Sequence, residues 1–212
     1  KFKDNGRDFF NVAGHITFSP IEEITVQFGH DKNFIGNGYR SLILSNDATP
    51  NTFLKLNTKA WKFNYMSLYS VHTDSKGFDG NSPTRRKYSA LHHLSLNLGK
   101  NLKLGIWENV IFDRQDSLEN DQFEVDYFNP LIFYRAVEHG LNSSDNVLVG
   151  MDWKWNFLSR FSFYGQFVLD EFIKDDFFNA TNSWVNKWGY QAGLKYINVG
   201  GITNLDAQLE IN

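Results

Sequence analysis

The sequence predicts an all-β fold, namely an antiparallel transmembrane β-barrel, and two observations carry this prediction. Runs of alternating apolar and polar residues recur along the chain, and each run is the pattern of a strand with one apolar face. The connections between successive runs alternate strictly between short and long. All long connections therefore fall at one end of an antiparallel array, as the extracellular loops of outer-membrane barrels do.

The ten expected strands lie at 9–18, 22–30, 53–60, 62–72, 88–98, 102–113, 145–156, 160–172, 184–196 and 202–212. The short links are Ser19 to Ile21, a turn near Trp61, Gly99 to Asn101, Phe157 to Ser159, and Asn198 to Gly201. The long loops are His30 to Thr52, Thr73 to Arg86, Arg114 to Ser144, and Ile173 to Ser183. A soluble β-sandwich has no reason to sort its loops by length in this way.

The expected strand 145–156 shows the two faces most clearly. Apolar side chains share one face: Val147, Val149, Met151, Trp153 and Trp155. Mostly polar residues share the other: Asn146, Gly150, Asp152, Lys154 and Asn156. Strands 184–196 and 202–212 repeat this pattern. Alternation alone does not separate a membrane barrel from a soluble sandwich, in which the apolar face is the core.

Strand length and aromatic content favour the membrane. Most expected strands have about ten residues or more, whereas soluble strands have roughly 5–6 and a bilayer-crossing strand needs about 9–11. Aromatic residues make up 17% of the chain. Many lie near strand ends, where interfacial girdles are expected: Trp61, Phe112, Trp155, Phe157, Phe172, Trp184 and Tyr196.

The composition excludes several classes of function. The chain has no cysteine, which excludes disulfides, a thiolate nucleophile and a cysteine-ligated metal. A net charge of -3 gives no electrostatic basis for nucleic-acid binding. No apolar run reaches the roughly 18 residues of a membrane helix, and the mean hydropathy of -0.42 is compatible with a barrel because lumen-facing residues are polar. Neighbouring His92 and His93 point to opposite faces of a strand, so they cannot bind one metal ion together. We expect no metal and no cofactor.

The ends of the chain suggest a piece of a larger barrel. The chain opens on a loop-like segment, Lys1 to Gly6, and stops inside a patterned strand, Glu210 to Asn212. We therefore expect a single outer-membrane β-barrel domain over 1–212 that is incomplete at both ends. The export signal is expected to be removed or to lie upstream.

Four stretches resemble a known family: FGHDKNFIGNGYRSLILS at 28–45, FLKLNT at 53–58, YFNPLIFYRAVEHGLNSSDNV at 127–147, and FSFYGQFVLDE at 161–171. They are similar to the Bacteroidetes branch of Wzi-like capsule-assembly barrels, including its gliding-motility members. The resemblance implies a barrel of about eighteen strands in the bacterial outer membrane. It also implies that the protein binds or anchors surface polysaccharide, or belongs to a gliding-motility or surface-secretion complex.

The first long loop carries the main candidate ligand residues: His30, Asp31, Lys32, Asn33, Tyr39 and Arg40. Their donors and acceptors suit sugar hydroxyls, and the tyrosine ring offers a stacking surface. Arg40 has the geometry to pair with the carboxylate of an acidic sugar. The alternative is a structural plug inside the barrel, its charges satisfied by wall residues such as Lys55 or Glu23. The two roles can coexist.

The third long loop adds Tyr127, Asn129, Arg135 and Glu138 to the candidate set. A short helical or irregular segment folded into the barrel is expected there, because Pro130 interrupts strand pairing.

No catalytic residue is expected. His93, Ser95 and Asn97 have the spacing of an outer-membrane phospholipase site. These three residues lie on the face opposite Leu94 and Leu96, which should contact lipid, so a lipid substrate would not reach them. The three polar side chains therefore point into the lumen, where they are wall groups.

Two classes of function remain open. The first is a non-enzymatic surface protein whose loops bind glycan or the proteins of a motility or secretion machine. The second is a passive, porin-like diffusion channel lined by charges of mixed sign: Lys55, Lys59, Lys103, Asp152, Lys154, Lys187, Lys195, Asp206 and Glu210. Large loops rich in aromatic residues favour occlusion over an open pore. In both cases the lipid bilayer is a partner and nucleic acid is not.

Overall fold

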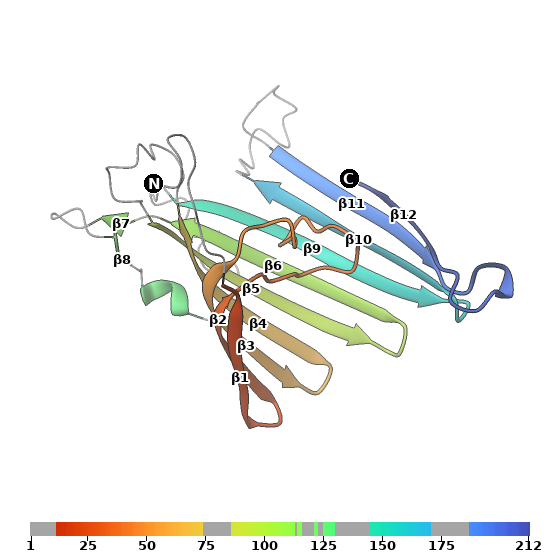
Figure 1. The fold of residues 1–212 in the computed structure, drawn as a ribbon, viewed down its shortest axis with the longest axis horizontal. Coiled ribbons are helices and arrows are strands. Elements are labelled where there is room, and N and C mark those ends of the chain that lie inside the picture. The colour runs from red at the N-terminus through yellow and green to blue at the C-terminus, as the bar shows by residue number, and fades with distance from the viewer. Residues whose placement is uncertain are drawn as a thin grey trace, which may run out of the picture.

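The computed structural model describes residues 12–73, 86–112, 114–115, 121–122, 125–129, 145–170 and 187–212. One antiparallel sheet contains ten strands in the order β1-β2-β3-β4-β5-β6-β9-β10-β11-β12, so each strand pairs with the one before it in the chain (Figure 1). Their bounds are β1 Gly14–Ile21, β2 Ile24–Asp31, β3 Asn51–Ala60, β4 Phe63–Thr73, β5 Arg86–Leu98, β6 Leu102–Phe112, β9 Asn146–Phe157, β10 Phe161–Asp170, β11 Lys187–Tyr196 and β12 Ala207–Ile211. The all-β antiparallel prediction is confirmed.

The remaining described elements are small. β7 (Arg114–Gln115) pairs with β8 (Asp121–Gln122), and two 3₁₀ helices, η1 (Val125–Phe128) and η3 (Val199–Gly201), lie in connections. In the part of the chain that the structure describes, no helix is long and apolar enough to span a membrane. β1 and β12 are the two edges of the sheet, which is open and not a closed barrel.

The alternation of short and long connections is confirmed. The short ones lie at 22–23, 61–62, 99–101, 158–160 and 197–206, and they occupy one end of the sheet (Figure 1). The long ones lie at 32–50, 74–85, 113–145 and 171–186. Below, these ends are called the short-turn end and the long-loop end.

The first turn was predicted too early. β1 continues through Pro20 to Ile21, and the turn consists of Glu22 and Glu23. A strand tolerates proline at an edge or a bulge, since no ladder hydrogen bond from its nitrogen is then required. β1 is an edge strand, and its register with β2 shifts between Phe18 and Ile21.

The last strand is shorter than predicted and covers 207–211 instead of 202–212. The preceding residues fold into a compact turn in which the Asn198 amide donates to Asp206 Oδ1 at 2.9 Å and the Asn204 amide donates to Asn198 Oδ1 at 2.9 Å. Asn198 and Asn204 have φ values of 52° and 64°, the left-handed region that asparagine tolerates better than most residues. Side-chain hydrogen bonds therefore outweigh the apolar alternation in this segment.

The sheet has a polar face and an apolar face, and many polar side chains are the buried ones. Buried residues of the polar face include His93, Ser95, Asp152, Ser162, Gln166 and Gln191. Exposed residues of the apolar face come from most of the strands: Ile16, Phe18, Phe28, Leu104, Ile106, Met151, Trp155, Phe163, Trp188, Tyr190, Leu194, Leu209 and Ile211. A soluble sheet buries the opposite face, with its apolar side in the core.

Aromatic rings cover glycines across several strand pairs. Three such pairs of opposed residues are Trp107 with Gly150, Trp153 with Gly165, and Tyr164 with Gly193. In each pair, a Cβ added to the glycine would collide with the ring of the aromatic partner. The glycine thus lets a large ring lie flat on the sheet, an arrangement that compensates for the missing side chain.

Candidate functional site

The connection between β2 and β3, residues 32–50, lies across the polar face and is called the plug loop below. Figure 1 shows it in orange, passing in front of the sheet from β2 toward β10. Wall side chains hold it at several points: Lys55 Nζ donates to Asn33 Oδ1 at 2.8 Å, and Lys195 Nζ donates to the Asn37 carbonyl at 2.8 Å. The contact of the loop with Lys55 is the one predicted for a plug. A plug inside a closed barrel stays a prediction, because the sheet is open.

The carboxylate that holds the plug loop is Glu210 on β12. Its Oε2 accepts the Tyr39 amide at 2.9 Å and its Oε1 accepts the Arg40 amide at 3.1 Å. Tyr164 Oη donates to Oε2 at 2.6 Å. Glu23, the alternative partner named from the sequence, lies in the turn between β1 and β2 at the short-turn end. Sequence reasoning did not connect Glu210 with the plug loop, because no local pattern links residues 170 positions apart.

Two glutamines complete the attachment. Gln166 Oε1 accepts the Leu42 amide at 2.7 Å, and Gln191 Nε2 donates to the Arg40 carbonyl at 3.0 Å. Gly38 makes the close approach possible, since a Cβ there would collide with the Glu210 carboxylate and lie 2.8 Å from the Tyr164 ring. The polar side chains of β10, β11 and β12 thus replace the water that loop amides and carbonyls would otherwise bind.

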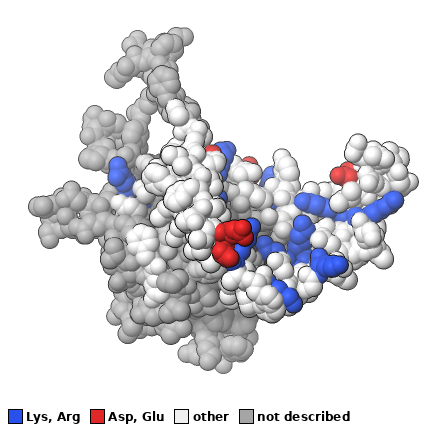
Figure 2. Space-filling view, turned by 90° about the horizontal axis from the view of Figure 1, so that it is seen from below, with Lys and Arg blue, Asp and Glu red and all other residues white. Residues whose placement is uncertain are grey.

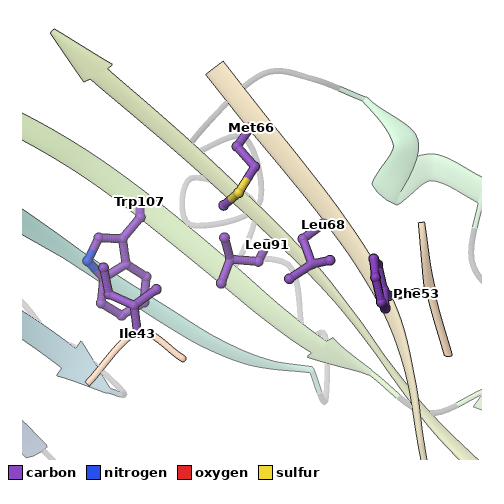
Figure 3. Close-up of a cluster of buried hydrophobic side chains, with 6 residues drawn as sticks. All are labelled: Ile43, Phe53, Met66, Leu68, Leu91 and Trp107. Carbon is purple, nitrogen blue, oxygen red and sulfur yellow. The ribbon is translucent and has the colours of Figure 1, made fainter. Parts of the chain in front are cut away.

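Apolar packing seats the middle of the plug loop. Ile43 lies against a buried cluster on the polar face, formed by Phe53, Met66, Leu68, Leu91 and Trp107 (Figure 3). Ile35 and Leu44 pack against the same cluster and bridge to each other through backbone pairing. The loop is therefore held by both apolar burial and hydrogen bonds.

Tyr39 and Arg40 combine a backbone fixed by a wall residue with exposed side chains. Their backbone amides are fixed by Glu210, but the Tyr39 side chain is exposed, with 81% of its surface accessible, and Arg40 is exposed too. An aromatic ring and a guanidinium on a fixed backbone need little ordering when a ligand binds. These adjacent residues form the candidate ligand site.

The other four candidates of this loop region make structural contacts. His30 Nδ1 lies 3.2 Å from Thr52 Oγ1, and Asp31 accepts from the Lys32 amide at 2.7 Å. Asp31 Oδ2 also lies 2.9 Å from His15 Nδ1. Lys32 Nζ donates to the Asn46 carbonyl at 2.8 Å, and Asn33 is buried beside Lys55. The contacts of Lys32 and Asn33 are the ones expected of a plug. His30 and Asp31 belong to β2, and their contacts with Thr52 and His15 join neighbouring strands.

A short helix, η1, is present in the third long loop, but residues 125–129 do not fold onto the polar face as predicted. The rest of the segment for which this fold was predicted lies outside the described residues. Tyr127 of η1 stacks on Phe112 with 4.3 Å between ring centroids, and Phe128 contacts Tyr69 with centroids 4.6 Å apart. Phe112 and Tyr69 belong to the apolar face, so η1 covers that face and not the polar one. Apolar burial decides its position, because the polar face is occupied by the plug loop.

The candidates of the third loop accordingly receive different environments. Tyr127 is buried, and its hydroxyl donates to Asp145, so the ring has no free surface for a sugar. Asn129 is half-buried. Arg135 and Glu138 lie outside the described residues.

A buried pair on the polar face involves the phospholipase-like residues. His93 Nε2 lies 2.6 Å from Asp152 Oδ1, and Ser95 Oγ donates to the Asn64 carbonyl at 3.4 Å. Gly105 provides the space for this pair, since a Cβ there would collide with Asp152 and lie 2.7 Å from His93 Nε2. His93 and Ser95 thus make hydrogen bonds to other residues of the sheet, as expected of polar groups in its polar face.

The fold defines an all-β protein built from one antiparallel meander whose polar face carries an anchored loop. Comparison with protein-family models, with curated proteins and with solved structures finds no match to this chain.

Replacing Glu210 with alanine is expected to loosen the plug loop. Both amides at Tyr39 and Arg40 lose a charge-assisted acceptor, so local opening should become about tenfold more frequent. Trypsin cleaves after Arg40 only when the loop opens, and the rate of appearance of this cut, followed by mass spectrometry, measures the opening. Glu22→Ala is the matched control, because it removes one carboxylate from an exposed turn. Equal cleavage rates in the two variants would contradict the anchor role.

Proposed function

We propose that the chain is part of an outer-membrane β-barrel, closed by the plug loop, that binds surface polysaccharide through Tyr39 and Arg40. The observation that carries the proposal is the combination of an apolar face that is exposed outside the area covered by η1 with a polar face whose middle is buried under the plug loop. A large exposed apolar surface needs a non-aqueous partner, and lipid suits a face that extends over nearly every strand.

Aromatic residues at the short-turn end support the membrane part of the proposal. Trp155, Phe157, Phe161 and Tyr196 form a stacked row with successive centroid distances of 4.8, 5.4 and 4.4 Å. Such rows are typical of the interfacial girdle of outer-membrane barrels. Of the other aromatic residues expected in a girdle, Phe112 is buried under η1, and Phe172 and Trp184 lie outside the described residues.

The chemistry of the exposed pair supports the glycan part. A tyrosine ring can stack on the apolar face of a pyranose, and a guanidinium donates bidentately to a carboxylate. The contacts of four of the wall charges argue against the alternative of an open diffusion channel. Lys55, Lys195 and Glu210 bind the plug loop, and Asp152 binds His93, so these groups are not free to line a water-filled pore.

The resemblance to Wzi-like capsule-assembly barrels stays a prediction, as does a total of about eighteen strands. It agrees with the proposed location in the bacterial outer membrane and with polysaccharide as the ligand. Participation in a gliding-motility or secretion complex belongs to the same proposal. It would use the surfaces of the long loops, which gather at the end opposite the short turns.

The double variant Tyr39→Ala/Arg40→Ala is expected to bind polysaccharide about 10- to 100-fold more weakly, since it loses both the stacking surface and the charge-assisted donor. The protein is reconstituted into liposomes, and retention of polysaccharide extracted from native cells is measured by co-flotation. Failure of the unmodified protein to float with lipid would contradict the barrel.

The matched control is Trp61→Ala/Lys62→Ala, which removes an exposed aromatic residue and a cation in the turn between β3 and β4. Lys62 Nζ lies 4.7 Å from the centroid of the Trp61 ring. This turn belongs to the short-turn end. Retention should be unchanged in the control variant. Equal losses in both variants would contradict the assignment of Tyr39 and Arg40 as the ligand site.

A further inference from the structure

We propose a second ligand site, a basic pocket at the short-turn end of the polar face that binds an acidic carbohydrate. The pocket is a cavity of ≈ 410 Å³ between the ends of β5, β6 and β9. Gly99 and Leu102 line part of it, and the rest of the lining is cationic and amidic: Asn97, Lys100, Asn101, Lys103, Lys154 and Asn156.

Strand register forces the cations together. Lys103 of β6 is directly opposite Lys154 of β9, and Asn97 of β5 is opposite Lys103 on the other side. Lys100 follows in the turn between β5 and β6. Like charges at directly opposed positions repel each other, so the sheet places these two lysines side by side at a cost to stability. This arrangement is expected where an anion binds between them.

No protein carboxylate neutralises the two opposed lysines within the described residues. The ion pairs His15–Asp31 and His93–Asp152 do not involve a lysine of the pocket. Asp152, the nearest acidic side chain along β9, is already bound to His93. In the right half of Figure 2, Lys and Arg cover more of the described surface than Asp and Glu do, although uncharged residues cover most of it. Both lysines are half-buried, which strengthens their field at the pocket.

The asparagines indicate the rest of the ligand. A carboxamide both donates and accepts hydrogen bonds, as the hydroxyls of a carbohydrate require, whereas lysine only donates. Three ammonium groups and three carboxamides around one cavity therefore suit a hydroxyl-rich ligand that carries a carboxylate or a phosphate group. The volume is large enough for a small oligosaccharide, because ligand sites typically measure about 300–1,000 Å³.

The pocket is separate from the Tyr39 and Arg40 site. On β5, β6 and β9, the row Ser95, Gly105 and Asp152 lies between the pocket and the cluster under Ile43. Toward β12, Tyr164 and Gly193 stand between Lys154 of the pocket and Glu210, which holds the Tyr39 and Arg40 amides. The inference extends the proposed function by naming an acidic ligand class, but it rests on the pocket alone. A failure of either site can therefore be recognised independently.

The test measures binding to the detergent-solubilised protein by isothermal titration calorimetry, with trigalacturonate, glucose 1-phosphate, maltotriose and inorganic phosphate as probes. At least one acidic sugar should bind about tenfold or more tightly than maltotriose, and the difference should shrink at high salt. The tighter of the two acidic sugars then identifies the acid group as carboxylate or phosphate. Inorganic phosphate should bind more weakly than that sugar, because it lacks the hydroxyls that the asparagines bind.

The double variant Lys103→Gln/Lys154→Gln should lose about tenfold or more in affinity for the acidic sugar. Lys59→Gln, which removes a lysine of the same face outside the pocket, and Tyr39→Ala/Arg40→Ala should bind as the unmodified protein does. Equal affinity for maltotriose and the acidic sugars, or unchanged binding in the Lys103/Lys154 variant, would overturn the proposal. Inorganic phosphate binding as tightly as the acidic sugar would overturn its carbohydrate part.

Discussion

Replacing Trp107 with alanine is expected to lower the free energy of unfolding by about 3–5 kcal/mol, the range for a large buried aromatic side chain. Trp107 has 0% of its surface exposed. Its ring covers Gly150 on the neighbouring strand and packs in the cluster that seats Ile43 of the plug loop (Figure 3). The substitution therefore removes both the ring that packs on Gly150 and part of the cluster that Ile43 of the plug loop contacts.

Urea-induced unfolding in detergent micelles, followed by far-ultraviolet circular dichroism, measures this loss without depending on tryptophan fluorescence. Tyr39→Ala is the control, since Tyr39 is 81% exposed on the plug loop and is not among the aromatic residues expected at the membrane interface. The control should change stability by less than about 1 kcal/mol, as surface substitutions usually do. Similar losses in both variants would mean that Trp107 does not hold the plug and the sheet together.

The second large effect is expected from the smallest possible addition, Gly105→Ala. The new methyl group would collide with the Asp152 carboxylate and lie 2.7 Å from His93 Nε2. The two side chains are 6% and 4% exposed, so separating them leaves polar groups buried without their partner. Overpacking and the loss of the His93–Asp152 contact together should lower the free energy of unfolding by about 3 kcal/mol.

Gly14→Ala provides a matched control for this substitution. Gly14 also lies in a strand, but an added Cβ there has nothing within 4 Å. Alanine should be tolerated or slightly stabilising at Gly14, because it restricts the unfolded chain more than glycine does. If the same unfolding assay gives equal stabilities for the two variants, then Gly105 is not required for the His93–Asp152 pair.

The sequence was sufficient to predict most of the strands. Alternation with period two depends only on the direction of successive side chains, so a segment such as 146–157 reveals its two faces without any knowledge of its neighbours. The sorting of loops by length is equally local. The observed strands differ from the predicted ones where contacts with residues outside a segment outweigh its local preference. Pro20 is accepted because β1 is an edge, and 202–206 leave the strand because Asn198 and Asp206 bind across the turn.

The candidate site was predicted in part. The attachment of this loop to the polar face through Lys55 was predicted from residue types that suit such a contact. The sequence did not predict which side chains of this loop bind the rest of the protein and which stay free. Lys32, Asn33, Tyr39 and Arg40 are all polar or amphipathic, and their contacts depend on the residues that the fold brings next to them. The position of η1 was also beyond the sequence, since aromatic residues pack equally well on either face until one face is occupied.

The sequence by itself determined the strand order, the two faces of each strand and the end at which the long loops gather, because these follow from the period of the pattern and the lengths of the connections. Only the tertiary structure decided which face is buried, which carboxylate holds the plug loop, and which two lysines face each other. Those outcomes depend on distances between residues that are far apart along the chain. Glu210 meets Tyr39 and Arg40, and Lys103 meets Lys154, only after the register of the intervening strands is set.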